Sequence, residues 1–319
     1  MSGAVSARVR DGERGARMRA LIKLPAERFL GSSLIGALMR QKLRGARLVL
    51  AYHGVVPNGE VVAGERALFV TQREFGRQLE LVTRLAQIVP LSEIAEAGGD
   101  RPRVAITFDD AYRGAVVAGV EELAHRGLPA TFFVAPGRLD DHVFWWDALA
   151  NSDGLLDPAI RRYALEQLAG VDERVREWAR STGRACRDDV PPHARTASLD
   201  ELRRAVAVPG ITVGSHSWSH ASLAELSPSS VEDELTRTER WLQREFPDRC
   251  VPWLAYPYGI DSTEARLVAT GLGYLGALRV SGGWHHAETE APFGRPRMNV
   301  SAGLSLAGFS ARMNGAVRT

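Results

Sequence analysis

The sequence is poor in cysteine and shows no pattern typical of a disulfide scaffold. Its 319 residues include only Cys186 and Cys250, and neither lies in a CxxC pair or another metal-ligand spacing. Because a chain of this length can bury a substantial core without covalent cross-links, we expect both to be reduced thiols, as in a cytoplasmic protein.

Long hydrophobic runs are also missing. The run Phe29–Met39 contains about ten residues, whereas a helix that spans a bilayer needs roughly 20. The shorter run Leu21–Leu24 is interrupted by Lys23 and followed by Pro25, which does not fit a secretory signal. We therefore expect neither export nor a membrane span.

Positive charge is in excess only at the N-terminus. Residues 1–47 carry eleven Lys and Arg side chains and three acidic ones, so this segment is +8, the remaining residues are −6 and the whole chain is +2. The remainder gives no indication of nucleic-acid binding. For the basic segment 1–46, with one or two amphipathic helices expected over residues 24–43, two interpretations stay open. It packs against the domain that follows, or it is a peripheral anchor on an anionic membrane face.

From residue 47 to residue 319, short apolar runs alternate with longer helical patterns. The runs are rich in β-branched and aromatic residues, which is typical of buried parallel strands. They are Leu48–Tyr52, Val104–Phe108, Ala130–Val134, Ile211–Val213, Trp253–Tyr256 and Leu275–Val280. The helical patterns between them include Thr71–Ala86, Ala115–Arg126 and Pro228–Phe246. This alternation predicts an α/β domain with a parallel sheet, either a barrel or an open sheet.

One stretch interrupts the alternation. Residues 138–208 contain no convincing strand but hold the aromatic segment Phe144–Asp147 and a charged helical pattern over Asp157–Arg184. A proline-containing loop and a short helix from Ser198 follow. We expect a helical insertion between two strands of the sheet.

Two adjacent carboxylates, Asp109 and Asp110, follow one of the predicted strands. Ligands bind at the carboxyl ends of parallel strands, and two like charges so close together are relieved by a bound cation. The alternative is that the aspartates cap a helix that begins near Tyr112. This motif alone leaves both interpretations open.

A pair of histidines, His216 and His220, follows another predicted strand. Residues at positions i and i+4 share one face of a helical turn, so both rings can converge on one ion. The alternative is two unrelated surface or capping histidines. Together with one carboxylate the pair would form a site that polarises a carbonyl and activates water, with the second carboxylate as general base. Similar triads also serve iron oxygenases, so the residue set does not by itself select hydrolysis.

The sequence resembles the polysaccharide deacetylase family, also known as the NodB-homology domain or carbohydrate esterase family four. The motifs that carry the resemblance are Thr107–Asp110 (TFDD), His216–His220 (HSWSH) and Ala255–Gly259 (AYPYG), and it covers roughly residues 47–300. A sub-group of the family is similar in further segments, here Tyr52-His53, FWWD and Pro296-Arg297. The resemblance implies a distorted (β/α) barrel with fewer than eight repeats. It also implies hydrolysis of an N-acetyl group, with water as nucleophile and acetate as product.

The resemblance also implies roles for individual residues. Asp109 matches the catalytic base, and Asp110, His216 and His220 match the ligands of a divalent metal, usually zinc. The backbone N–H of Tyr258 matches the donor to the tetrahedral oxyanion.

Two residues that assist catalysis in the family are missing from their usual places. Ala255 stands where the third motif has an arginine, and no histidine follows Asn299 to protonate the leaving amine. His53, and after it His285 or His286, are candidates for the acid, and Arg297 is a candidate for the missing positive charge. Several aromatic residues near the motif loops are candidates for a sugar platform, with core packing as the alternative. They are Trp145, Trp146, Trp218, Tyr258 and Trp284.

Our leading expectation is a metal-dependent amide deacetylase, a hydrolase of carbon–nitrogen bonds other than peptide bonds. Its substrate would be an N-acetylhexosamine-containing glycan or glycolipid precursor, and its location cytoplasmic or at the inner face of the membrane. Two alternatives are kept: a catalytically weak or inactive sugar-binding relative, and a deacylase of a non-polymeric amide or ester.

Overall fold

The structure of the protein is a computed structural model that describes residues 43–96, 101–286 and 291–316. The helices expected over residues 24–43, and almost all of the basic segment 1–46, lie outside the described residues. Both cysteines are free, as expected. Among the residues described, no helix is long and apolar enough to cross a membrane.

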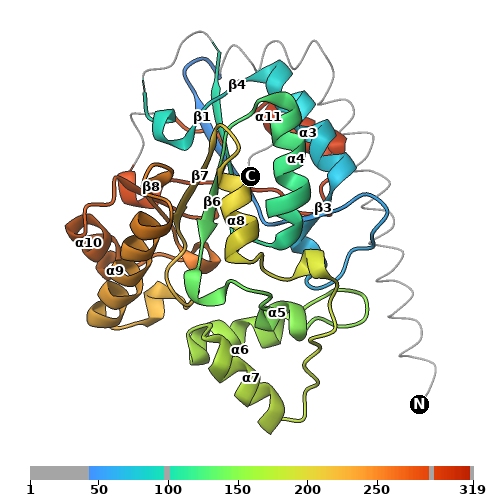
Figure 1. Ribbon diagram of the computed structural model, residues 1–319, viewed down its shortest axis with the longest axis vertical. Helices are drawn as coiled ribbons and strands as arrows, with labels where there is room; N and C mark the ends of the chain where they lie inside the picture. Colours follow the sequence, from blue (N-terminus) through green and yellow to red (C-terminus); the bar gives the residue numbers. More distant parts are fainter. Residues whose placement is uncertain (1–42, 97–100, 287–290, 317–319) are drawn as a thin grey trace, which may run out of the picture.

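A parallel sheet, curled into a half-barrel, forms the centre of the molecule (Figure 1). Its strands lie in the order β10-β1-β5-β6-β7-β8-β9, with β4 also paired to β5. They are β1 Arg47–Tyr52, β4 Gln87–Ile88, β5 Arg103–Phe108, β6 Ala130–Val134, β7 Ile211–Ser215, β8 Cys250–Ala255, β9 Gly276–Leu278 and β10 Met298–Asn299. A small second sheet pairs β2 (Gly54–Val56) with β3 (Phe69–Thr71). All six predicted strands are confirmed, with shifts of at most three residues at their ends.

Both faces of the central strands are buried. In β1, Leu48 and Leu50 belong to the largest apolar cluster, whereas Val49 belongs to a second cluster on the other face. In β5, Ile106 belongs to the first of these clusters and Ala105 to the second. One face packs against helices, and the other lies inside the curled sheet, where strand residues such as Phe133 and Trp253 meet. Strands that are buried on both faces have continuous apolar runs.

Helices surround the outer face of the curled sheet (Figure 1). In that view α3, α4 and α11 lie on one side of the strands, and α9 and α10 on the other. Their bounds are α3 Gln72–Leu85, α4 Val120–Arg126, α9 Pro228–Glu245, α10 Thr263–Gly271 and α11 Leu306–Met313. The expected capping box at the start of α3 is present, because Thr71 accepts from the backbone of Glu74 and the Glu74 side chain accepts from Thr71. The predicted helix from Ala115 is one turn of π-helix, Ala115–Gly119, before α4 begins.

The helical insertion expected between two strands is present between β6 and β7. It contains α5 (Trp145–Ala148), α6 (Pro158–Leu168), α7 (Asp172–Ser181) and α8 (Leu199–Val206). The single helical pattern expected over Asp157–Arg184 is broken at Ala169 and Gly170, whose φ values of 54° and 63° are left-handed. Figure 1 shows α5, α6 and α7 together beyond the end of β6, which is the end of the sheet where the motif loops lie.

Candidate metal centre and active site

The register of the sheet brings the motif residues to one place. Tyr52 of β1 pairs with Phe108 of β5, so His53 and Asp109 leave two neighbouring strands side by side. Val134 of β6 pairs with Ser215 of β7, and His216 follows directly. The carboxyl ends of these parallel strands therefore form the rim on which sequence analysis expected the chemistry to lie.

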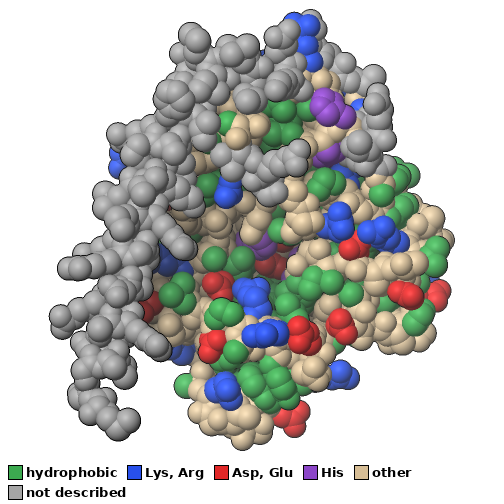
Figure 2. Space-filling view, turned by 180° about the vertical axis from the view of Figure 1, so that it is seen from behind, with side chains coloured by type: hydrophobic (Ala, Val, Ile, Leu, Met, Phe, Trp, Pro, Cys, Tyr) green, Lys and Arg blue, Asp and Glu red, His purple; other side chains and the backbone are tan. Residues whose placement is uncertain are grey.

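A pocket of about 120 Å³ lies at this rim. Figure 2 shows histidine and acidic side chains together in a hollow near the middle of one face. The lining residues come from the motif loops, the insertion and the strand ends. They are His53, Leu68, Asp109, Asp110, Trp146, Arg161, His216, His220, Tyr258, Gly259, Val280 and Asn299.

Three buried side chains in this pocket can hold one metal ion. Asp110, His216 and His220 each offer a ligand atom, and these atoms all lie within 4.8 Å of one another. Asp110 Oδ1 is 2.9 Å from His220 Nε2 and 3.6 Å from His216 Nε2, which suits ligands bound to one ion at roughly 2.0–2.2 Å each. Within the described residues, Asp110 Oδ1 is buried and has no hydrogen-bond partner. Two imidazoles and one carboxylate, with an oxygen left unsatisfied, fit zinc or a similar divalent ion.

Burial shapes the protonation of the three side chains. It raises the pKa of Asp110 to about 6 and lowers the pKa of His220 to about 4. It also lowers the pKa of His216. Both imidazoles are therefore neutral near pH 7, which is the form in which histidine binds metals.

The loop that carries the two histidines is not a helical turn, so that part of the expectation was wrong. Ser217 and His220 both have φ near 60°, in the left-handed region. The rings nevertheless lie together, with centroids 4.7 Å apart. His216 Nδ1 lies 2.7 Å from the carbonyl oxygen of Ala255. A hydrogen bond there fixes the tautomer that presents Nε2 to the pocket.

The two aspartates do not cap the following helix, and in this respect the capping interpretation was wrong. Asp110 and Ala111 have left-handed φ values of 69° and 51°. Helical residues do begin at Arg113, but the Asp109 carboxylate accepts from Arg297 and Asp110 Oδ1 has no hydrogen-bond partner among the described residues. This tight turn sends the two carboxylates in different directions. Asp110 points to the histidines, and Asp109 points to Arg297.

Arg297 is fully buried and holds Asp109 in a bidentate ion pair. Its two terminal nitrogens donate to the two carboxylate oxygens at 2.7 Å each, and one of them also donates to Thr107 Oγ1 at 3.1 Å. Burial alone would raise the pKa of Asp109, but the charge and hydrogen bonds of Arg297, with smaller contributions from His216 and His53, together hold this pKa well below its usual range. The positive charge that Ala255 cannot supply thus reaches the site from the neighbourhood of β10.

Of the histidine candidates, only His53 lies in the pocket. Its Nε2 is 3.9 Å from Asp109 Oδ2, and burial lowers its pKa. His285 pairs through its backbone with Arg47 at the start of β1, at the opposite end of the strand from the site. His286 follows it in the chain and does not contribute to the pocket lining.

Two of the five candidate aromatic residues line the pocket, namely Trp146 and Tyr258. Tyr258 has a left-handed φ of 60° and its hydroxyl donates to the carbonyl of Gly170 at 2.9 Å. Trp145 is fully buried, Trp218 lies under the Arg237 guanidinium, and the Trp284 indole donates to the backbone of Arg312. These three belong to packing, the alternative that we kept open.

Sequence analysis missed several residues of the pocket. Arg161, on α6 of the insertion, lines it and forms an ion pair with Glu65 at 3.3 Å. Leu68 and Asn299 also line it. No local pattern distinguishes Arg161 from its neighbour Arg162, because only the fold of the insertion decides which arginine faces the site.

Comparison with known proteins gives consistent results. The sequence profile described as polysaccharide deacetylase matches residues 96–277, more than half of the chain. The Streptococcus pyogenes deacetylase PplD in complex with acetate is similar in structure, with a TM-score of 0.60 and 16% identity over 85% of this chain and 99% of that one. IcaB from Ammonifex degensii is similar with a TM-score of 0.58 and 17% identity, over 85% and 97% of the two chains. At these identities the likeness shows the fold, and it confirms the distorted barrel. No curated protein sequence matches significantly.

Proposed function

The chain belongs to the polysaccharide deacetylase family and is thus a hydrolase of amide carbon–nitrogen bonds, and from this premise we propose that it removes N-acetyl groups from an N-acetylhexosamine-containing glycan or glycolipid precursor with the help of a divalent metal. The observation that carries the proposal is the buried cluster of Asp110, His216 and His220 beside an ionised Asp109. We propose zinc as the metal because the ligands are two imidazoles and one carboxylate.

We propose separate roles for the three metal ligands and for Asp109. Asp110, His216 and His220 would hold the ion, which supplies Lewis-acid chemistry to the acyl carbonyl and to water. Asp109 would take the proton from the attacking water, since Arg297 keeps this carboxylate ionised and oriented. The backbone N–H of Tyr258 would donate to the developing oxyanion.

Cleavage of the carbon–nitrogen bond also requires a proton on the leaving amine. His53 is the histidine of the pocket that stands nearest to Asp109, at 3.9 Å. We propose that the proton taken by Asp109 reaches the leaving nitrogen through His53. This route needs no histidine after Asn299, and it accommodates a His53 that burial keeps neutral before the reaction.

The basic charge of residues 1–46 supports a proposal about the position of the enzyme in the cell. We propose a cytoplasmic protein whose basic segment 1–46 contacts the anionic inner face of the membrane, where lipid-linked sugars would be its substrates. Pelleting with anionic liposomes, compared between the full chain and a chain that begins at residue 47, tests this contact. Equal pelleting of the two forms would exclude it.

One experiment separates this function from its two alternatives. The purified protein is incubated with N-acetylglucosamine oligomers and, separately, with a simple acetate ester, and released acetate is measured. Acetate from the oligomers supports the proposal. Acetate from the ester alone would favour a deacylase of non-polymeric substrates, and zinc binding without any acetate would favour a sugar-binding relative.

A further inference from the structure

The two histidines of the proposed metal site are held in different ways. The Nδ1 atom of His216 lies 2.7 Å from the carbonyl oxygen of Ala255, which orients the ring as in most metal-binding histidines. The Nδ1 atom of His220 is buried and has no hydrogen-bond partner among the described residues. Apart from the contact of its Nε2 with Asp110 Oδ1 at 2.9 Å, the ring of His220 is placed by its backbone and by the side chains that pack on it.

The backbone before His220 is under strain. Ser217 and His220 are both left-handed, a conformation that costs a residue with a side chain roughly 1–2 kcal/mol. Such conformations persist only where the surroundings hold them. Glu234 of α9 accepts from the backbone nitrogens of Trp218 and Ser219, at 2.8 Å each. These bonds hold two backbone N–H groups of the loop, but they do not hold its carbonyl groups.

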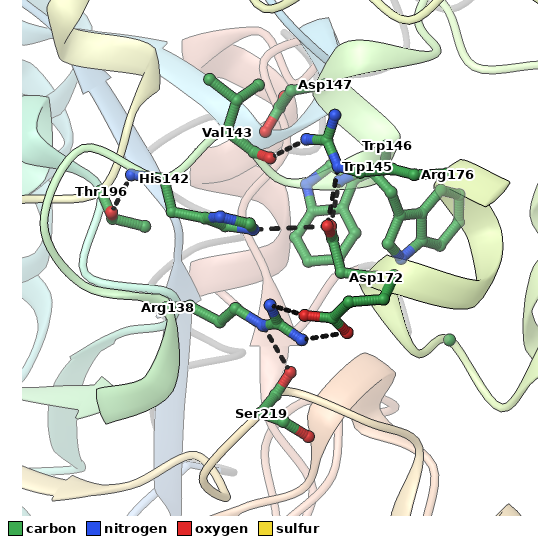
Figure 3. Close-up of polar contacts among 12 residues, drawn as sticks. Arg138, His142, Val143, Trp145, Trp146, Asp147, Asp172, Arg176, Thr196 and Ser219 are labelled. Atoms are coloured by element: carbon green, nitrogen blue, oxygen red, sulfur yellow. Dashed lines mark hydrogen bonds and ion pairs between the residues drawn. The ribbon is translucent and has the colours of Figure 1, made fainter. Parts of the chain in front are cut away.

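Arg138 holds the carbonyl group directly before His220. Its Nε donates to the Ser219 oxygen at 2.9 Å, as Figure 3 shows. Its two terminal nitrogens donate to the two carboxylate oxygens of Glu173 on α7, at 2.6 and 2.9 Å. Arg138 is buried, whereas the side chain of Glu173 is 68% exposed. A planar guanidinium fixed in this way cannot rotate away from Ser219 without losing a bidentate pair.

The insertion also supplies part of the packing around the His220 ring. Trp146 of α5 lies with its centroid 4.9 Å from the imidazole, and Phe144 lies at 5.4 Å. On α7, Asp172 accepts from the backbone nitrogen of Trp145 at 2.8 Å (Figure 3). Helix α7 is thus connected to His220 in two ways. Glu173 acts through Arg138 and Ser219 on the backbone side, and Asp172 acts through Trp145 and the neighbouring Trp146 on the ring side.

We propose that Arg138, fixed by Glu173 of the helical insertion, is the positioning residue for the metal ligand His220. The insertion thereby sets the metal affinity of the site, in addition to covering the pocket. This inference rests on the metal site of the proposed function. It adds that two residues outside the family motifs, neither of which is a ligand, determine how tightly the ion is held.

The test measures the zinc affinity of the full chain by competition with a chelating dye. We expect Arg138→Met to weaken zinc binding by roughly 10–100-fold, the usual effect of losing a residue that orients a ligand. Glu173→Ala should weaken it less, and the double variant should bind zinc no more weakly than Arg138→Met alone, because both changes remove one interaction. Arg203→Met, which removes an arginine–glutamate pair with Glu245 away from the pocket, is the matched control and should bind zinc normally.

Two further measurements make the outcome of the zinc titrations unambiguous. Thermal unfolding of the metal-free variants, measured beside the wild type at the temperature of the zinc assay, should show that each is folded, so that a loss of affinity reports on the site. The visible spectrum of bound Co²⁺ should change in Arg138→Met as the His220 ligand is displaced. Wild-type zinc affinity in both variants, or losses that simply add in the double variant, would overturn the inference. If the wild type itself binds no zinc, the metal site of the proposed function fails as well.

Discussion

Arg297 and Asp109, separated by 188 residues in the sequence, form a buried bidentate ion pair with both hydrogen bonds at 2.7 Å. The pair places a fixed positive charge behind the proposed catalytic base. We expect Arg297→Lys to lower kcat by at least ~100-fold, since lysine keeps the charge but not the two parallel hydrogen bonds. Steady-state kinetics check this, and zinc affinity should change little because Arg297 contacts none of the three proposed ligands.

A matched control for Arg297→Lys is Arg126→Lys, which alters a half-buried pair with Glu122 on α4, away from the pocket, and should leave kcat unchanged. Arg297→Met is less informative, because loss of one partner of a buried ion pair costs about 3–5 kcal/mol of stability. Wild-type kcat in folded Arg297→Lys would contradict the positioning role.

The loss of activity on replacing His53 should depend on the leaving group of the substrate, and it should be larger for a poorer leaving group. An amine leaves only when protonated, whereas a nitrophenolate leaves without a proton. We therefore expect His53→Gln to lower acetate release from N-acetylglucosamine oligomers by ~100-fold or more and to leave hydrolysis of nitrophenyl acetate nearly unchanged. An equal loss on both substrates would show that His53 acts in some way other than as the acid.

His216 should be essential for metal binding. We expect His216→Ala to abolish stoichiometric zinc binding, since it removes one of three ligands and opens the site to water. The exposed His125 on α4 provides the control, and His125→Ala should retain one zinc per chain. Zinc content after dialysis, measured by elemental analysis, decides the matter, and full occupancy in His216→Ala would refute the ligand assignment.

Asp147 should make the stability of the protein depend on pH. Burial raises the pKa of Asp147 from 3.8 to about 7, although Tyr112 donates to it at 2.5 Å and the backbone of Glu65 at 2.7 Å. Between about pH 4 and pH 7 the folded state therefore keeps a proton that the unfolded state has released, and the free energy of unfolding falls as pH rises through this window.

The substitution Asp147→Asn isolates this contribution. The variant should lose that fall, so that its stability relative to the wild type increases from pH 4 to pH 7 by on the order of a few kcal/mol at most. Urea unfolding at several pH values measures the difference, with Asp153→Asn, on an exposed turn of the same insertion, as the control. Parallel pH profiles for wild type and Asp147→Asn would contradict the raised pKa.

The sequence predicted the sheet and the central residues of the site because both depend on local signals. Buried parallel strands appear as short apolar runs, and the residues that follow Phe108 and Ser215 must emerge at one edge of the sheet. Asp110, His216 and His220 could therefore be placed together without knowledge of the loops. The left-handed turns at Asp110 and Ser217 were not predicted, since neither residue is a glycine and the conformation is imposed by neighbours distant in sequence.

Local sequence patterns do not predict the contacts that support the site residues. Arg138 and Glu173 stand in a segment rich in charged residues, and nothing in their spacing distinguishes this pair from others such as Arg203 with Glu245, which lies away from the pocket. Arg297 could be suspected because the usual arginine is replaced by Ala255. Its partner Asp109 became evident only from the pairing of β1 with both β5 and β10.

The most direct test of the central claim is acetate release from N-acetylglucosamine oligomers by protein that has been stripped of metal and then reloaded with zinc, beside Asp109→Asn. The account predicts that release stops on chelation, returns with zinc, and is at least ~100-fold slower in Asp109→Asn, which should still bind zinc because Asp110, His216 and His220 remain. Acetate release that survives both chelation and the substitution would contradict it.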